Sequence, residues 1–322
     1  MTYLYDIGIS RGQRLPISTA IDADSDSIGE LLTAEGFQHY VETDKPLADL
    51  AAESIRRTLE SSATNAEDVD AIFLITESFW DNEIPKYTDQ FDSTISLRHS
   101  LLGMMSDVGL SHAQPYGVWM SACANFGAAL GLANSVVSTG HHHNALIVAA
   151  DKLAPEVPRL MHNNAAVWSD ISASCLIGSE ARGFKIRESI TVSAPKVASF
   201  NFLNRSELPK ILSATIRAVK RLDAAFEKRV GRPVREFEFI VVNHFHRQSL
   251  RILTDILKIP GERLRRDALA DYAHGYAADN MLTLSKLESD QDVPSGQEIV
   301  LFNSSIWTWS LSLVEKVEVT KD

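Results

Sequence analysis

Short apolar runs alternate with amphipathic stretches along most of the chain. Continuous apolar runs such as AIFLIT at 71–76 are typical of strands buried on both faces. Apolar residues three and four positions apart, as in 46–60, indicate helices packed on a core. These patterns predict strands at 71–76, 116–122, 144–151, 168–180, 237–244, 295–303 and 307–319. They predict helices at 46–60, 96–106, directly after Cys123, 208–228 and 250–260.

The two halves of the chain follow a similar order of elements. VDAIFLIT (69–76) and FEFIVVNH (237–244) each place an acidic residue before an apolar strand. No low-complexity segment or Pro/Ser-rich linker separates the halves. We therefore expect an α/β fold with an internal duplication, in which halves 1–181 and 182–322 share one continuous core.

Composition narrows the class of protein. The chain has 322 residues, of which 45% are hydrophobic and 23% charged, which is ordinary for a globular protein. A net charge of -11 disfavours nonspecific binding to nucleic acid or an anionic membrane. No run of 18 apolar residues occurs, the first residues lack signal-peptide features, and two cysteines form no disulfide framework. We expect a cytoplasmic protein.

Cys123 stands where a predicted strand of small residues meets a helix N-terminus. Free backbone N–H groups at that place favour a thiolate, so the position predicts a lowered thiol pKa and a reactive cysteine. The same N–H groups suit the oxyanion of an acyl intermediate. The alternative is a small buried core residue, which cysteine often is. Cys175 lies inside a predicted strand and is interpreted as structural.

Five motifs follow one another with these spacings: DVDAIFLIT (68–76), ACANF (122–126), ALIVAAD (145–151), WSDISAS (168–174) and SSIWTWS (304–310). Together they resemble the thiolase-fold condensing enzymes, most closely the ketoacyl-acyl-carrier-protein synthase III branch. The resemblance covers nearly the whole chain. It implies a thiolase-like, duplicated, five-layered α-β-α-β-α fold and a homodimer.

The resemblance also implies chemistry. Members of the family carry an acyl group on the cysteine that matches Cys123. They pass it to an acceptor, usually a carbanion made by decarboxylating a malonyl thioester, with the help of a histidine and an asparagine. The implied substrate is an acyl-CoA or acyl-carrier-protein thioester.

The family histidine has two candidates here. Its motif H-Q-A-N-L-R-I is similar to the region 242–252, and matching Leu-Arg-Ile to Leu-Arg-Ile selects His246. The helix phase agrees, because it predicts a core-facing row at Leu250, Ile252, Leu253, Ile256 and Leu257. Counting along the strand selects Asn243 or His244 instead. For either histidine the alternative is a loop residue bonded to backbone.

The family asparagine is replaced. Its motif H-G-N-T-S-A-A-S is similar to the stretch from His274, where Tyr276 stands in the asparagine position. Asn280 and His274 are the other candidates for a third catalytic residue, and the alternative is a helix start without chemistry. Losing one donor puts decarboxylative condensation in doubt but leaves acyl transfer to oxygen or nitrogen open.

The last loop departs from the family too, because Ser304 and Ser305 replace glycines. The backbone N–H of Ser305 is expected to join that of Cys123 in an oxyanion hole.

The remaining sequence features are less informative about function. No nucleotide-binding glycine pattern is present, so no cofactor is expected. His141–His143 is interpreted as a solvated loop rather than a metal site. Seven basic residues are candidates for docking an acidic acyl carrier protein, with a solvated helix face as the favoured alternative. They are Arg217, Lys220, Arg221, Lys228, Arg229, Arg232 and Arg235.

The sequence therefore predicts an acyltransferase of the ketoacyl synthase III-like type in specialised fatty-acid or polyketide metabolism. Cys123 would take the acyl group, with His246 or His244 as the base. Two alternatives stay open: an acyl-thioester-binding subunit that serves an active partner, and a thioesterase or decarboxylase on the same fold.

Overall fold

The computed structural model describes residues 1–322 except 22–25, 79–99, 162–163, 202–203 and 318–322. Among these described residues, ten strands form one hydrogen-bonded sheet in the order β10-β9-β11-β12-β8-β1-β7-β6-β4-β5. Each half of the chain supplies five neighbouring strands. The halves join where β1 and β8 pair antiparallel over Thr2–Leu4.

The halves repeat one topology. In the first half, β4 lies between β5 and β6 and is parallel to both, while β7 is antiparallel to β6 and β1. The first-half strands are β1 (Thr2–Arg11), β4 (Ala71–Ile75), β5 (Gln114–Val118), β6 (Ala145–Asp151) and β7 (Ile171–Gly178).

In the second half, β9 lies between β10 and β11 and is parallel to both, while β12 is antiparallel to β11 and β8. Its strands are β8 (Phe184–Ser193), β9 (Phe239–Val242), β10 (Leu264–Arg265), β11 (Glu298–Ser304) and β12 (Thr308–Lys316). The strand order matches that of the first half position by position, as an internal duplication predicts.

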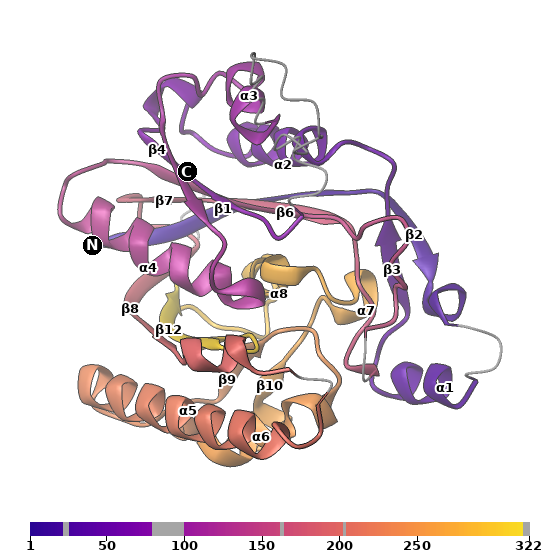
Figure 1. Cartoon of the computed structure of the whole chain (residues 1–322). Coiled ribbons are helices and arrows are strands. Elements are labelled where there is room, and N and C mark those ends of the chain that lie inside the picture. The colour runs from indigo at the N-terminus through magenta and orange to yellow at the C-terminus, as the bar shows by residue number, and fades with distance from the viewer. Residues whose placement is uncertain (22–25, 79–99, 162–163, 202–203, 318–322) are drawn as a thin grey trace, which may run out of the picture.

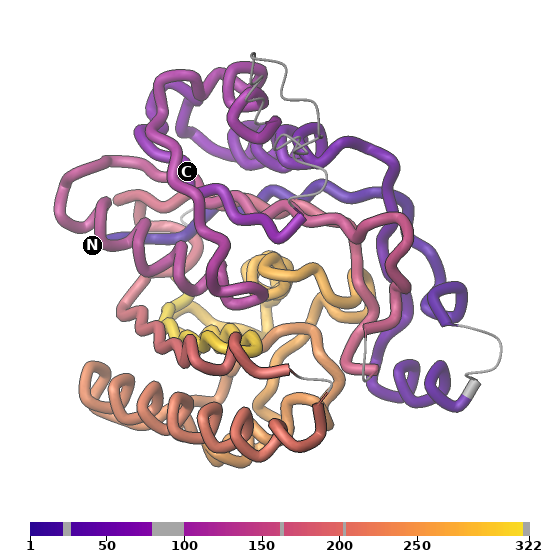
Figure 2. The backbone as a smooth tube through the Cα atoms, viewed as in Figure 1, coloured from indigo at the N-terminus to yellow at the C-terminus, as the bar shows by residue number. Residues whose placement is uncertain are grey.

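Helices complete the layers seen in Figure 1. One outer layer contains α2 (Leu47–Glu60) and α3 (Ser100–Asp107), and the other contains α5 (Leu208–Val230) and α6 (Arg247–Leu257). The middle layer between the two sets of strands contains α4 (Asn125–Ser138) and α8 (Asp279–Ser289). Figure 2 follows the backbone from the indigo-to-pink first half into the orange-to-yellow second half.

A smaller unit lies beside these layers. It contains α1 (Asp26–Ala34), the short helix α7 (Leu269–Tyr272), and the two-stranded sheet of β2 (Gln13–Pro16) and β3 (His39–Glu42). Its own apolar cluster includes Leu32, Phe37 and Leu269. This unit brings the segment after α7 to the edge of the middle layer, which is where the site lies.

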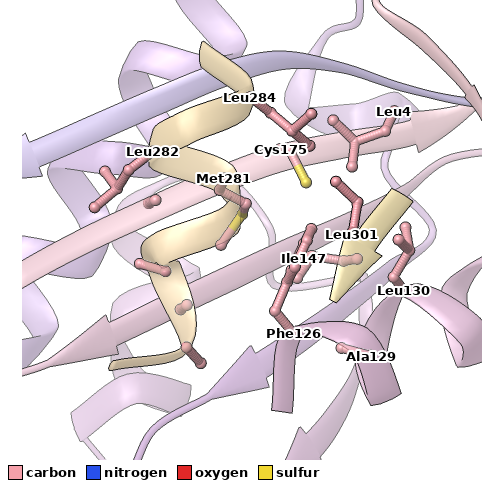
Figure 3. Close-up of a cluster of buried hydrophobic side chains, with 14 of the residues drawn as sticks. Leu4, Phe126, Ala129, Leu130, Ile147, Cys175, Met281, Leu282, Leu284 and Leu301 are labelled. Atoms are coloured by element: carbon pink, nitrogen blue, oxygen red, sulfur yellow. The ribbon is translucent and has the colours of Figure 1, made fainter. Parts of the chain in front are cut away.

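The central core explains why the apolar runs of the sequence are strands. All residues of β4, β6 and β7 are buried, because helices cover both of their faces. Side chains from both halves meet between the layers, among them Phe126, Ile147, Met281 and Leu301 (Figure 3). A core shared between the two halves was predicted from the missing linker.

Two details differ from the sequence prediction. Ile252 is 48% exposed rather than core-facing, so the apolar row of α6 is narrower than its periodicity indicates. β1 and β8, which join the halves, were not predicted, since their apolar and polar residues do not form a continuous run. None of the helices that the structure describes has the length and apolar character that a membrane crossing requires.

Candidate active site

Cys123 lies on a tight turn between β5 and α4. A short 3-10 helix spans Ala122–Ala124 and leads directly into α4. Ala122 has φ of 48°, an unfavourable backbone conformation for a residue with a Cβ. The turn is held by Asn125, whose Oδ1 accepts the backbone N–H of Ser121 at 2.8 Å. Asn243 adds a bond from the second half, from its Nδ2 to the carbonyl of Cys123 at 3.3 Å.

Gly127 allows the cysteine helix to lie close to the second half. A Cβ at this position would fall 1.7 Å from Oγ of Ser310 on β12. Any side chain here would push α4 away from the strand that follows the last loop. The small residues after Cys123 therefore bring the nucleophile helix against the other half of the molecule.

His274 is the imidazole that the structure places at the thiol. Its Nε2 lies 3.5 Å from Sγ of Cys123, and its Nδ1 lies 2.5 Å from Oδ2 of Asp279. Both Cys123 and His274 are buried, and Asp279 has no solvent exposure. The three side chains form a line in which a carboxylate orients an imidazole that faces a thiol, the arrangement of a nucleophilic triad.

The triad is assembled from both halves of the chain. His274 follows α7, and its backbone N–H and C=O pair with Val167 and Ser169 of the first half. Its ring packs against Trp168, with centroids 4.8 Å apart, and against Phe245 at 4.5 Å. Backbone pairing and aromatic packing on two sides fix the ring beside Cys123.

Asp279 is the first residue of α8 and is held by several donors. Its Oδ1 accepts the backbone N–H of Gly275 at 2.7 Å, and its Oδ2 accepts that of His244 at 2.8 Å. Burial alone would raise the pKa of this carboxyl, but His274 and His244 hold it below its ordinary value. Asp279 is therefore a carboxylate that accepts the Nδ1–H of His274, leaving Nε2 as the basic atom.

The electrostatics of Cys123 correct the sequence prediction of a lowered thiol pKa. Burial raises the pKa of Cys123 well above its ordinary value, and the carboxylates of Glu77, Asp279 and Asp151 raise it further. The backbone N–H of Cys123 opposes this effect but does not overcome it. The thiol is neutral at rest and needs a base at the moment of reaction.

His244 lies behind the triad rather than at the thiol. Its Nδ1 is 2.6 Å from the carbonyl of Ala273, and its Nε2 is 2.9 Å from Oγ1 of Thr283. Both ring nitrogens are thus engaged within the fold. Burial lowers the pKa of His244, although Asp279 acts in the opposite direction. Its position supports Asp279 and the turn that carries His274.

His246 begins α6 and faces a different neighbourhood. Its Nδ1 accepts the backbone N–H of Gln248 at 3.1 Å, which makes it the N-cap of that helix. Its Nε2 lies 3.9 Å from Oε1 of Glu35. The structure therefore places His274, and not His246, at the sulfur. His246 bonds to backbone as a helix cap, which is the alternative role that the sequence analysis left open.

Tyr276 and Asn280 are both buried near the turn of His274. Tyr276 has φ of 56° and stacks on Trp168 with ring centroids 4.2 Å apart. Burial raises its pKa, so its hydroxyl stays neutral. Asn280 is fully buried, and its side-chain amide has no hydrogen-bond partner among the described residues.

Ser305 uses its amide within its own turn. Its backbone N–H donates to the carbonyl of Thr308 at 2.9 Å, so this N–H is already paired and does not complete the expected oxyanion hole. The loop is tied to the nucleophile turn in another way, through the indole N–H of Trp307 and the carbonyl of Met120 at 2.8 Å. The amide of Cys123 is the remaining donor of the predicted pair.

Sequence reasoning named His274 only as one of three candidates for a third residue and missed Asp279. The signal was present in the spacing, because a histidine five residues before an aspartate at a helix start lets the carboxylate reach back to the ring. Glu77 and Asp151, the other carboxylates that act on the thiol, were also missed. Glu77 lies two residues after β4 and Asp151 ends β6, positions at which the apolar pattern alone indicates only the end of a strand.

The remaining predicted features lie away from the thiol. Several basic residues of 217–235 have partners within the chain: Arg221 bonds the carbonyl of Ser193, and Arg232 pairs with Glu298. His143 is 88% exposed in its loop. Within the described ranges, no three His, Cys, Asp or Glu side chains are grouped so as to hold a metal ion.

Comparison with known proteins agrees with the sequence resemblance. A ketoacyl-acyl-carrier-protein synthase III of Oenococcus oeni is 23% identical over 286 residues, which is 82% of this chain and 83% of the relative. The corresponding protein of Neisseria meningitidis is 26% identical over 57% of this chain, but the match spans only 52% of that relative. No family model matches the chain.

Solved structures are similar over the whole chain. An acyltransferase named ChlB3 has a TM-score of 0.78 at 14% identity, covering 98% of both chains. The 3-oxoacyl-acyl-carrier-protein synthase III of Aquifex aeolicus has a TM-score of 0.75 at 15% identity, covering 98% of this chain and all of that one. This duplicated topology and these structural neighbours show that the chain has the thiolase fold, and its sequence is similar to ketoacyl-acyl-carrier-protein synthases III.

Proposed function

We propose that this chain is an acyltransferase that forms an acyl thioester on Cys123 and passes the acyl group to an oxygen or nitrogen nucleophile. The observation that carries the proposal is the line from Sγ of Cys123 to Nε2 of His274 and from Nδ1 to Asp279. The relatives are named as synthases and an acyltransferase, which supports acyl transfer as the general type of reaction but not its acceptor.

In the first step, Nε2 of His274 takes the proton of the Cys123 thiol as the sulfur attacks the carbonyl of an acyl thioester. A raised thiol pKa makes this base necessary, since little thiolate exists beforehand. Asp279 stabilises the imidazolium that forms. The imidazolium then protonates the departing thiolate, which leaves as a thiol, and the acyl group remains on Sγ.

In the second step, the neutral His274 receives the proton of the acceptor. The acceptor's oxygen or nitrogen attacks the thioester carbon, the carbon–sulfur bond breaks, and Cys123 takes the proton back from His274. One imidazole serves both steps, and the backbone N–H of Cys123 faces the developing oxyanion. No other acid or base is required for the balance.

Transfer to oxygen or nitrogen fits the site better than decarboxylative condensation. Stabilising an enolate requires N–H donors aimed at the thioester oxygen. With Asp279 accepting the Nδ1–H, Nε2 of His274 is an acceptor rather than a donor. His244 bonds Ala273 and Thr283 with its ring nitrogens, and Tyr276 replaces the family asparagine.

The acyl donor has an apolar approach to the loop beside the nucleophile. A cleft of about 610 Å³ lies between the start of α5 and α6, and Ser305 and Ile306 line it. Leu208, Leu212 and Ile252 give it exposed apolar walls. The cleft suits the arm of an acyl-CoA or acyl-carrier-protein thioester, with a homodimer as the expected assembly.

Intact-mass measurement tests the proposal. The protein is incubated with acetyl-, butyryl- and octanoyl-CoA, and each chain is weighed. We expect a gain equal to one acyl group that hydroxylamine removes, that Cys123→Ala abolishes and that Cys175→Ala leaves intact. Labelling that persists in Cys123→Ala contradicts the proposal. A carbon–carbon product from malonyl-CoA and the acylated protein would favour the condensing alternative.

A further inference from the structure

Two carboxyl groups meet beside the nucleophile at the carboxyl ends of neighbouring parallel strands. Glu77 lies two residues after β4, Asp151 ends β6, and β4 lies between β5 and β6. Cys123 follows β5 at the same edge of the sheet. This edge is where α/β proteins place ligands, because loops from several strands converge there.

Only one of the two carboxylate oxygens of Asp151 accepts hydrogen bonds from the described residues. Its Oδ1 accepts bonds from the backbone N–H of Glu77 at 2.6 Å, from Oγ of Ser78 at 3.1 Å and from Oγ1 of Thr76 at 3.2 Å. Asp151 is 1% exposed, yet its Oδ2 has no partner among the described residues. A buried carboxylate oxygen without a donor costs free energy that a ligand donor would recover.

Glu77 presents a second such oxygen. The residue is partly exposed as a whole, but its Oε1 is shielded from solvent and has no partner within the described ranges. Burial and the neighbouring Asp151 raise the pKa of Glu77 to about 8, and burial raises that of Asp151 to about 7. Both carboxyls are therefore more readily protonated than ordinary acidic side chains.

Glu77 and Asp151 affect the electrostatics of Cys123, the thiol of the triad. Glu77 is the charged group with the largest effect on the thiol of Cys123, ahead of Asp279 and Asp151. Asp151 and Glu77 both act on the hydroxyl of Tyr276 as well. The electrostatic effects on the thiol and on Tyr276 agree with the meeting of these strand ends at one edge of the sheet.

We infer that Glu77 and Asp151 form a polar wall of the acyl site and select acyl groups that carry a hydroxyl or ammonium substituent over plain alkyl groups. The inference rests on the proposed acylation of Cys123. A plain alkyl chain would bury against two oxygens and leave them unpaired, whereas a donor on the acyl group would satisfy them.

Acylation rates of Cys123 by butyryl-, 3-hydroxybutyryl- and 3-aminobutyryl-CoA test this selectivity, with intact mass as the readout. We expect the wild-type protein to react at least about tenfold faster with a donor-bearing thioester than with butyryl-CoA. Glu77→Leu is expected to bring the three rates within about twofold. Glu77→Gln is expected to keep most of a hydroxyl preference and to lose an ammonium preference, because an amide oxygen accepts but carries no charge.

Glu288→Gln is the matched control, because Glu288 is another shielded carboxyl with a raised pKa that acts on Cys175 instead of Cys123. It is expected to leave the rate ratios unchanged. Equal wild-type rates, or a preference for butyryl-CoA, overturn the inference. So do unchanged rate ratios in Glu77→Leu, or an unchanged ammonium preference in Glu77→Gln, which would mean that the carboxyls only share a proton with each other. If no thioester acylates the wild type, the proposed function fails first and the inference with it.

Discussion

The two cysteines of this chain are both buried and free, yet their surroundings are opposite. Cys175 is in the middle of β7, and apolar side chains such as Leu4, Ile147 and Leu284 surround it (Figure 3). Cys123 lies on a strained turn with an imidazole at 3.5 Å. Burial raises the pKa of both thiols. Reactivity here is therefore a question of which thiol has a base, and thiol acidity does not separate the two.

The largest expected effect comes from removing that base. His274→Ala should slow acylation of Cys123 by butyryl-CoA roughly 10⁴-fold, which would make Cys123 resemble Cys175. His246→Ala is the matched control: it removes an N-cap, costs about 1 kcal/mol of stability and leaves the acylation rate near that of the wild type. Single-turnover mass measurements and thermal unfolding give both numbers. A greater loss in His246→Ala would return the catalytic role to His246.

A smaller effect is expected from the carboxylate behind the imidazole. Asp279→Asn should lower the acylation rate on the order of 10²-fold, because an amide in this position no longer favours the tautomer with a basic Nε2. The loss should shrink as the pH rises, since hydroxide then generates thiolate without the imidazole. A pH–rate profile checks this, and a uniform loss at every pH would indicate a purely structural defect.

The other cysteine provides the reverse case. Cys175→Ser should destabilise the protein by about 2 kcal/mol, because it introduces a hydroxyl where the surroundings are apolar. Its acylation rate at Cys123 should equal that of the wild type. Chemical denaturation measures the first quantity and intact mass the second, and a slower acylation would show that the central core transmits strain to the nucleophile.

The smallest expected effect concerns the charges near the Cys123 thiol. Above about pH 8, where Glu77 is ionised, Glu77→Gln removes a negative charge that opposes the thiolate, so the pKa of Cys123 should fall toward its ordinary value. At a fixed pH below that pKa, alkylation by iodoacetamide should become about fivefold faster. A rate profile against pH should shift to lower pH in this variant. A shift to higher pH would mean that Glu77 does not act on the thiol as a charge.

The strands and the turn that carries Cys123 could be predicted from the sequence because their signals are local. A continuous apolar run such as 71–76 predicts a buried strand from its own residues. A cysteine directly before an apolar helix likewise predicts a turn at that point. The position of His274 depends on pairing with Val167 and Ser169, more than a hundred residues earlier. His246 matched the family motif along the chain, but the chain direction at the end of β9 takes its ring toward Glu35. No local pattern carries that information.

The pairing of the Ser305 amide has a different origin, in the geometry of one hairpin turn. Sequence matching showed which residue replaces a glycine, but the turn that pairs Ser305 with Thr308 is closed by β11 and β12 coming together. Gly127 is the converse case, because its need for a missing Cβ appears only once β12 lies beside α4. The first contact lies within one hairpin and the second joins α4 to β12, and neither follows from residue identity alone.

Because the thiol comes from the first half and its imidazole–carboxylate partner from the second, chemistry has to wait for biosynthesis to finish. A ribosome-bound chain whose first half has emerged carries Cys123 on its turn but lacks any group to accept the proton. Such a precursor would be insensitive to cellular thioesters until α7 and α8 arrive and dock. Assembly of the thiol with its imidazole therefore requires both duplicated halves to fold together.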